Sequence, residues 1–201
     1  MDMTNEKIER LMQPRQPNYR GVHPQKFLMW LLIIASIMLF GAVTSAIIVS
    51  SADSPWIDFE MPNQFYISTV IVLLSSLTAQ MAFINAKKDN LNMIKVFSAA
   101  TFILGIVFIT LNYSGWMELA SNGFALANEM VGGQSASFFH FATYLHAAHV
   151  LLGLVFVAVV FIRTFQFKVH RKNMLMINIS TTYWHFVDIL WIYLFLFLIL
   201  S

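Results

Sequence analysis

The chain has 201 residues, of which 58% are hydrophobic and 11% are charged. Soluble globular domains carry about 25% charged residues, so this composition excludes that class and indicates an integral membrane protein. The formal charge of +2 gives no support for a nucleic acid partner, because the basic residues are divided among loops, and the absence of cysteine excludes disulfides and thiolate metal ligands.

The first 26 residues are polar and contain three prolines, Pro14, Pro17 and Pro24. They lack the short basic, apolar and small-residue layout of a cleaved signal peptide. We therefore expect residues 1–26 to form a cytoplasmic N-terminal arm and residues 27–201 to form a transmembrane domain whose first span is retained.

Five apolar stretches are long enough to cross a membrane. A hydrocarbon layer about 30 Å thick takes roughly 20 helical residues. Stretches of that length occupy residues 27–49, 65–86, 95–113, 137–162 and 174–200. The loops are short and no repeat period is present, so the expected fold is an all-α integral membrane protein with one bundle of five transmembrane helices.

The positive charges predict the orientation of this bundle. All 12 Lys and Arg residues lie before the first span, around the second loop or in the fourth loop, whereas the first and third loops contain none. The positive-inside rule then places the N-terminus in the cytoplasm and the C-terminus on the periplasmic side.

Polar and small residues recur at helical spacing within four of the spans, which predicts faces buried against other helices. In chain order these faces comprise Thr69, Ser76 and Gln80; Ser98, Thr101 and Gly105; Ala142, His146, His149 and Gly153; and Thr181, His185, Asp188 and Ile192. No hydrophobic force operates between helices in lipid, so small residues and hydrogen bonds between helices are expected to hold the bundle together.

The run YWHFVDILWIYLF, residues 183–195, places His185 and Asp188 near the middle of the last span. A charge at the bilayer centre costs about 2.5–3.5 kcal/mol on insertion scales, so Asp188 needs a partner or a proton. His185 lies one turn earlier on the same face. His146 and His149 are the next candidates if the last two spans pack together.

Three interpretations of these four residues stay open. Imidazoles from two helices could hold haem or a metal ion, in a free-standing membrane protein that uses His146, His149 and His185. The same residues could relay protons or ions, although the last span is apolar beyond Asp188. The favoured interpretation is a structural network, which His140 could join, that locks the last two spans together and prepares a surface for a partner subunit.

Other catalytic patterns are missing from the sequence. It contains no Gly-rich phosphate loop after a strand, no GxSxG motif and no HExxH motif. We therefore expect no catalytic residue and no cofactor or metal site in this chain.

Two motifs in the last two spans resemble haem-copper oxidase subunit III. Tyr183-Trp184-His185-Phe186-Val187-Asp188, followed by Trp191, resembles the signature of that family's final helix. His146-Ala-Ala-His149-Val150-Leu151-Leu152-Gly153 resembles the His-x-x-His-Val-x-x-Gly segment of the helix before it. Weaker similarity extends through Phe59-Glu60-x-Pro62 and Leu74-Ser75-Ser76-Leu77-Thr78, which look like the start and body of the helix after the first outer loop.

The resemblance implies a non-catalytic subunit of a terminal respiratory oxidase. In that family the haems and copper belong to subunits I and II, which would be partners of this chain, with a larger respiratory supercomplex as a further option. Subunit III packs against subunit I, holds phospholipid in a cleft between its helices, and is thought to sustain proton uptake and protect subunit I during turnover. Several bacterial relatives have five helices, so the resemblance also implies a multi-pass protein of the bacterial plasma (inner) membrane.

The chain departs from the family pattern at two acidic positions. Many members carry a glutamate midway through the helix that corresponds to the first span here, where this chain has Ala35 and Ser36. A second acidic position corresponds to Gly115. A proton role of those carboxylates is therefore not transferred. The expectation is subunit III of a cytochrome c oxidase, with the matching subunit of a quinol oxidase or a nitric-oxide-reductase-associated homologue as alternatives.

Overall fold

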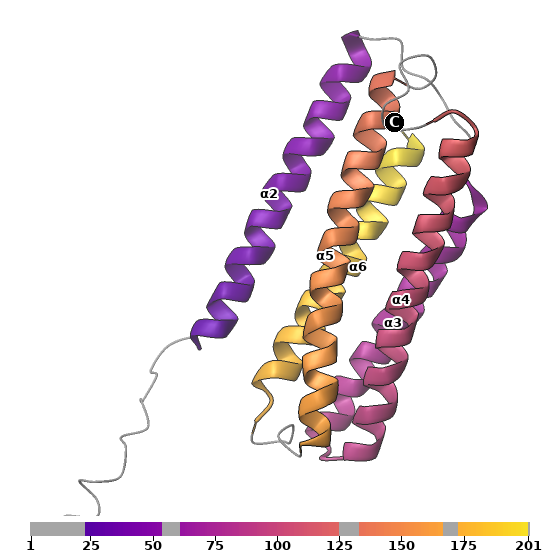
Figure 1. Ribbon diagram of the computed structural model, residues 1–201. Helices are drawn as coiled ribbons and strands as arrows, with labels where there is room; N and C mark the ends of the chain where they lie inside the picture. Colours follow the sequence, from indigo (N-terminus) through magenta and orange to yellow (C-terminus); the bar gives the residue numbers. More distant parts are fainter. Residues whose placement is uncertain (1–22, 54–60, 125–132, 167–172, 201) are drawn as a thin grey trace, which may run out of the picture.

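The computed structural model describes residues 23–53, 61–124, 133–166 and 173–200 (Figure 1). The helices of this part are α2 (Pro24–Asp53), α3 (Asn63–Lys87), α4 (Leu91–Ser121), α5 (Gly133–Phe165) and α6 (Leu175–Leu200). All five are long and apolar enough to cross a membrane, which confirms the predicted all-α fold and its five spans. A helix satisfies its own backbone hydrogen bonds, which an apolar stretch in hydrocarbon requires.

The helices extend beyond the predicted spans, most clearly where α4 ends and α5 begins. α4 continues to Ser121 instead of ending near residue 113, and α5 begins at Gly133 instead of residue 137. The prediction counted only the apolar residues that cross the hydrocarbon layer. The extra turns carry polar groups, such as the Glu118 carboxylate of α4, which accepts a hydrogen bond from the Gln64 side chain of α3.

The helices α3 and α4 form the most extensive helix pair of the bundle. A short turn joins them, and the Asn90 side chain caps α4 by accepting a hydrogen bond from the Met93 backbone N–H at 3.4 Å. Between the two helices the hydroxyls of Thr78 and Thr101 lie 2.8 Å apart. The pair therefore behaves as a hairpin on which α5 and α6 pack.

The C-terminal helix α6 is the most enclosed element. It packs on α2, α3 and α5. In its most apolar 18-residue segment 44% of the residues are buried, against 28–33% for the corresponding segments of the other described helices. The residues of the last motif therefore face protein on several sides.

Helix α2 lies at the edge of the bundle, where it contacts α5 and α6 but not the α3–α4 pair (Figure 1). Its C-terminal half is held by Phe40, Val43 and Ile47, which pack with Leu190 and Leu194 of α6. The N-terminal half stands further from α5 and α6 in Figure 1.

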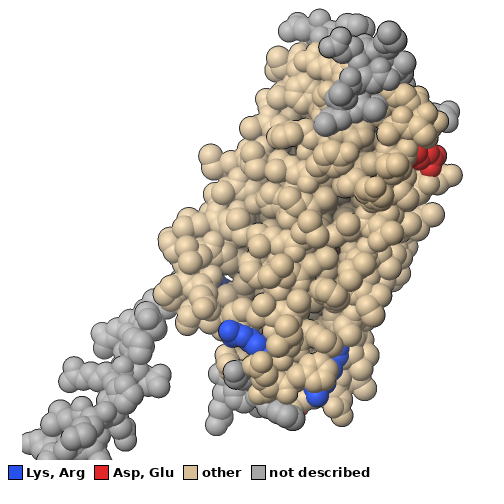
Figure 2. Space-filling view, in the orientation of Figure 1, with Lys and Arg blue, Asp and Glu red and all other residues tan. Residues whose placement is uncertain are grey.

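Charged side chains are separated along the bundle. Lys87 ends α3, Lys95 lies in the first turns of α4 and Arg163 lies near the end of α5, which places all three at one end. Figure 2 shows Lys and Arg at this end and an acidic side chain towards the opposite end. The Lys95 ammonium also lies 4.6 Å from the centre of the Phe165 ring, which links α4 to α5.

Candidate functional site

His185, on the outer side of α6, is bonded to α3. Its Nδ1 lies 2.7 Å from the Ser76 hydroxyl, and its Nε2 lies 3.1 Å from Gln80 Oε1. An amide oxygen can only accept, so Nε2 carries the proton and donates, while a neutral ring accepts at Nδ1 from the serine hydroxyl. The imidazole is half-buried, so this bond pair lies close to the membrane-facing surface.

Asp188 lies one turn further along α6 and is only 3% exposed. The Ser76 hydroxyl is its nearby polar neighbour, but neither carboxyl oxygen has a hydrogen bond of ordinary geometry within the described part of the chain. The Ser76 hydroxyl donates its proton to His185 Nδ1, so it has no proton left for this carboxyl group. A buried carboxyl group without a hydrogen-bond donor lowers the stability of the fold. Asp188 is enclosed by the packing of the helices and is not held by hydrogen bonds.

His146 is enclosed by aromatic rings. It is 1% exposed, and neither of its ring nitrogens has a hydrogen-bond partner among the described residues. The ring centre lies 5.1 Å from that of Trp191, 6.0 Å from that of Phe108 and 6.4 Å from that of Phe40. His146 therefore acts as a core side chain at the meeting point of α2, α4, α5 and α6.

His149 forms a hydrogen bond that connects α5 to α2, and not to α6 as expected. Its Nδ1 lies 2.8 Å from the Leu145 carbonyl oxygen of its own helix, and its Nε2 lies 3.1 Å from the Ser36 hydroxyl of α2. The same hydroxyl lies 2.8 Å from the Leu32 carbonyl oxygen, so one proton serves two acceptors. Ser36 thus faces His149, a histidine of the His-x-x-His motif.

The predicted network among His146, His149, His185 and Asp188 is not formed. No hydrogen bond joins any two of these described residues, because their polar atoms lie towards α2 and α3 or have no partner. Helical spacing fixes which residues share a face, but it does not say which neighbouring helix that face meets. His140, the further member, lies 2.8 Å through its Nδ1 from the Ala136 carbonyl oxygen of its own helix.

Trp184 of α6 contacts three other helices, α3, α4 and α5. Its Nε1 donates to Ser75 Oγ of α3 at 3.1 Å. Its six-membered ring lies so close to Gly105 of α4 and Gly153 of α5 that an added Cβ would come within 2.8 Å and 3.1 Å of its atoms, respectively. The motif glycine Gly153 and the small residue Gly105 therefore make room for one indole ring.

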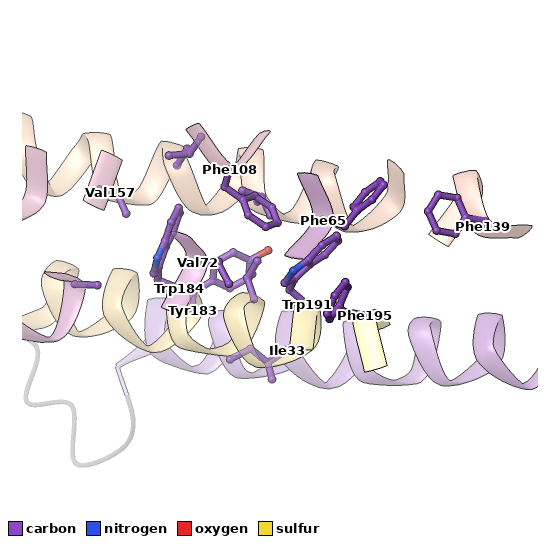
Figure 3. Close-up of a cluster of buried hydrophobic side chains, with 14 of the residues drawn as sticks. Ile33, Phe65, Val72, Phe108, Phe139, Val157, Tyr183, Trp184, Trp191 and Phe195 are labelled. Carbon is purple, nitrogen blue, oxygen red and sulfur yellow. The ribbon is translucent and has the colours of Figure 1, made fainter. Parts of the chain in front are cut away.

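Trp191 occupies the corresponding place two turns later in α6. Its Nε1 donates to Thr69 Oγ1 at 3.0 Å, and its ring packs against Phe65, Phe108 and His146. Figure 3 shows Trp184 and Trp191 projecting from α6 into the same aromatic core. Tyr183, the first residue of the motif, is fully buried and donates to the His149 carbonyl oxygen at 3.4 Å.

Several hydrogen bonds between helices were not predicted from the sequence, and two of them involve aromatic side chains of α6, Trp184 and Tyr193. Ser75 was part of the weaker similarity but not of the predicted face, and the bond from the Tyr193 hydroxyl to Thr44 Oγ1 at 3.0 Å was not anticipated. Trp and Tyr in a core need a hydrogen-bond partner for their polar atom. The Ser and Thr residues of the neighbouring spans were therefore usable candidates for these partners. Glu60 lies outside the described residues.

The residues that the structure describes contain no group of three or more His, Asp or Glu side chains placed to hold a metal ion. Hydroxyls in the spans mostly bond to carbonyl oxygens of their own helix, as Thr143 does to Phe139 at 2.9 Å. Some of these hydroxyl oxygens also accept from another helix, as Ser75 Oγ does from Trp184 Nε1 at 3.1 Å, and these bonds join helices. Fold and site together define a helical multi-pass membrane protein whose motif residues hold its helices to one another.

Comparison with known proteins gives the family. A profile of cytochrome c oxidase subunit III matches residues 20–200, and the chain belongs to this family. Similar proteins include the cytochrome bo(3) ubiquinol oxidase subunit 3 of Buchnera aphidicola subsp. Schizaphis graminum, 28% identical over 87% of this chain and 93% of that protein. A probable cytochrome c oxidase subunit 3 of Rickettsia felis is 29% identical over 84% of this chain and 66% of that protein. A probable quinol oxidase subunit 3 of Staphylococcus saprophyticus is 26% identical over 83% of each.

The family confirms the resemblance that rested on the two motifs. It makes the chain a subunit of an oxidase complex in a membrane, with other oxidase subunits as its partners. The named relatives include both cytochrome c and quinol oxidases, so the comparisons leave the electron donor open.

Proposed function

We propose that this chain is the non-catalytic subunit III of a terminal respiratory oxidase that takes electrons from cytochrome c. In this role it packs on subunit I and supports assembly, stability and proton uptake, while oxygen is reduced at the haems and copper of subunits I and II. The observation that carries the proposal is the family match over residues 20–200. The use of the motif residues Tyr183, Trp184 and Gly153 in helix packing supports it.

A quinol oxidase is the second candidate. It is favoured by the Buchnera relative, a ubiquinol oxidase subunit that matches 87% of this chain.

The charge distribution supports a location in the bacterial inner membrane with the N-terminus in the cytoplasm. Lys87, Lys95 and Arg163 share one end of the bundle, and Glu118 lies near the end of α4 that is directed away from it. The positive-inside rule places the basic end in the cytoplasm and the C-terminus of α6 on the periplasmic side.

A phospholipid is the ligand that we propose for a cavity beside α2. A cavity of about 310 Å³ lies between the N-terminal half of α2 and the helices α5 and α6, lined mainly by apolar side chains such as Leu28, Phe156 and Ile179. Arg163 and Gln25 line it as well. Apolar walls fit an acyl chain, and a guanidinium at the basic end fits a lipid phosphate.

Purification through a tag on this chain in mild detergent tests the function. The expected result is a complex that contains oxidase subunits I and II and consumes oxygen with reduced cytochrome c. Oxygen consumption with a quinol but not with cytochrome c would select the second candidate. Recovery of this chain without any oxidase subunit, from membranes in which oxidase activity is present, would contradict both.

A further inference from the structure

The outward side of the α3–α6 contact carries polar groups at membrane depth. On α3 it comprises Leu73 and Gln80, which are two turns apart, and on α6 it comprises His185, Ile189 and Leu196 at helical spacing. Leu73, Ile189 and Leu196 are 47%, 65% and 52% exposed. We call these five residues the α3/α6 face.

Gln80 is exposed on this face and its amide group is held in place. The Oε1 atom accepts from His185 Nε2 at 3.1 Å, and Ser76 holds the other nitrogen of the same ring at 2.7 Å. The amide NH₂ group, with two donors, has no hydrogen-bond partner within the described ranges. The His185 contact fixes the direction of these two donors relative to the bundle.

The depth of Gln80 decides what can satisfy these donors. It lies seven residues before Lys87, the last residue of α3, which is about 10 Å along the axis at 1.5 Å per residue. With Lys87 at the edge of the hydrocarbon layer, that distance places the amide below the headgroups. Acyl chains offer no acceptor, and an unsatisfied polar group in hydrocarbon costs several kcal/mol.

The outward side of α4 lacks this feature. Thr110 and Ser114 are exposed on α4, but their hydroxyls donate to carbonyl oxygens of the same helix, those of Ile106 and Leu111, both at 2.9 Å. Such hydroxyls can face lipid because their donor is already used. The α4 face is therefore suited to acyl chains, whereas the α3/α6 face is suited to a protein that brings an acceptor.

We propose that the α3/α6 face binds a transmembrane helix of a neighbouring protein chain, which offers a hydrogen-bond acceptor to the Gln80 amide. The partner is a helix because only a helix or a closed barrel satisfies its own backbone at this depth. Its apolar side chains pack on Leu73, Ile189 and Leu196. The proposal rests on the proposed function, since the partner is an integral subunit of the same complex, and it names the surface of contact.

Photo-crosslinking in native membranes tests the location of the contact. A benzoylphenylalanine is placed singly at Leu73 or Ile189 on the face, or at Ile103, which is 59% exposed on α4, as the matched control. Illumination is expected to give an adduct with an oxidase subunit from the first two positions and lipid adducts alone from the third. Lipid adducts alone from the face, a dimer of this chain, or equal adducts with the partner from Ile103 would each overturn the proposal.

Substitution of Gln80 tests the hydrogen bond. Gln80→Leu is expected to reduce the partner retained after mild detergent by about threefold to tenfold, since one or more hydrogen bonds to the partner are lost. Thr110→Val, which removes a hydroxyl from the α4 face, is expected to leave retention unchanged. Equal retention by both variants would overturn the proposal.

The two proposals fail in different ways. If no oxidase subunit is recovered with the unaltered chain, the proposed function fails. If the oxidase complex is recovered but crosslinks form from another face, the function stands and the α3/α6 face is not the contact surface. Gln80→Leu could also lower the stability of the chain itself. The crosslinking result does not depend on this, because the crosslinking variants leave Gln80 unchanged.

Discussion

Two glycines allow the Trp184 indole to lie between α4 and α5. A Cβ added at Gly105 would lie 2.7 Å from Leu154 Cδ2 and 2.8 Å from Trp184 Cη2, and one at Gly153 would lie 3.1 Å from Trp184 Cε3. We predict that Gly105→Ala lowers the free energy of unfolding by about 1–3 kcal/mol, because overpacking forces neighbouring side chains off their rotamers. Gly153→Ala should cost less, since its contacts are longer. Thermal unfolding of the purified variants in detergent measures both.

Gly41→Ala is the matched control for these variants. Gly41 also lies inside a spanning helix, but an added Cβ there would meet nothing within 4 Å. The alanine should therefore leave stability unchanged or raise it by up to about 1 kcal/mol through helix propensity. A loss at Gly41 as large as that at Gly105 would contradict the packing explanation.

A double-mutant cycle isolates the contact between Gly105 and Trp184. Trp184→Phe removes the ring that the new Cβ would meet, together with the bond from Nε1 to Ser75. We predict that the double variant Gly105→Ala/Trp184→Phe loses less stability than the sum of the single losses, with a coupling of about 0.5–3 kcal/mol for residues in contact. Chemical unfolding of the four proteins gives the coupling. Strict additivity would show that the two residues do not share this space.

Some of the residues that pack around Trp184 and Trp191 could be predicted from the sequence. Helical spacing identified Thr69 and Gly105 as members of buried faces, and the motif identified Trp184. Spacing gave no information on the partner of each residue, because the same face of α6 can meet α3 or α5. The distinction depends on the packing of the whole bundle, so the pairing of His185 with Ser76 and Gln80 could not be derived.

Helix α2 depends on few polar contacts. Ser36 meets His149 of α5, and Thr44 accepts from Tyr193 of α6. We predict that Ser36→Ala weakens the docking of α2 by about 1 kcal/mol, the net value of one hydrogen bond, which lowers the ratio of docked to undocked helix about fivefold.

Spin labels can measure this docking, because the chain has no cysteine of its own. Labels at Ser45→Cys on α2 and Leu151→Cys on α5, both exposed positions, give one distance distribution by pulsed electron paramagnetic resonance. Ser36→Ala should broaden this distribution towards longer distances, whereas Thr110→Val on α4 should not. Identical distributions in all proteins would show that the Ser36 contact does not hold α2.

The five spans were predictable as elements, and their ends were not. Apolar length against a hydrocarbon layer about 30 Å thick identifies a span without knowledge of its neighbours. The additional turns of α4 after residue 113 contain polar residues such as Ser114 and Glu118, which hydropathy excludes. These turns are helical because helix contacts outside the hydrocarbon layer continue, such as the bond from Gln64 to Glu118.

At the scale of the molecule, the cavity beside α2 makes a prediction about lipid. If Arg163 holds the phosphate of a phospholipid, Arg163→Gln should reduce the anionic phospholipid that is recovered with the purified complex about fivefold, since one basic residue contributes about 1 kcal/mol. Lys88→Gln is the matched control, because Lys88 lies at the same end of the bundle but does not line the cavity. Mass spectrometry of the retained lipid gives the result, and equal retention by both variants would count against the site.

The assignment to an oxidase came from residue identity in the two motifs, whereas composition and spacing alone led only to a helical membrane protein. His146, His149 and His185 would have suited a haem protein equally well on those grounds. The structure separates them: His146 packs among rings, His149 contacts α2 and His185 contacts α3. Each of the three imidazoles therefore takes part in a different contact of the bundle.

The visible absorption spectrum of the tagged chain, recorded within its complex and again after dissociation and repurification, tests this assignment most directly. The account predicts haem bands in the complex and no visible absorption, iron or copper in the isolated and still helical chain. Haem bands that stay with the isolated chain and are lost in His146→Ala or His149→Ala would contradict it, because this chain would then carry a redox centre of its own.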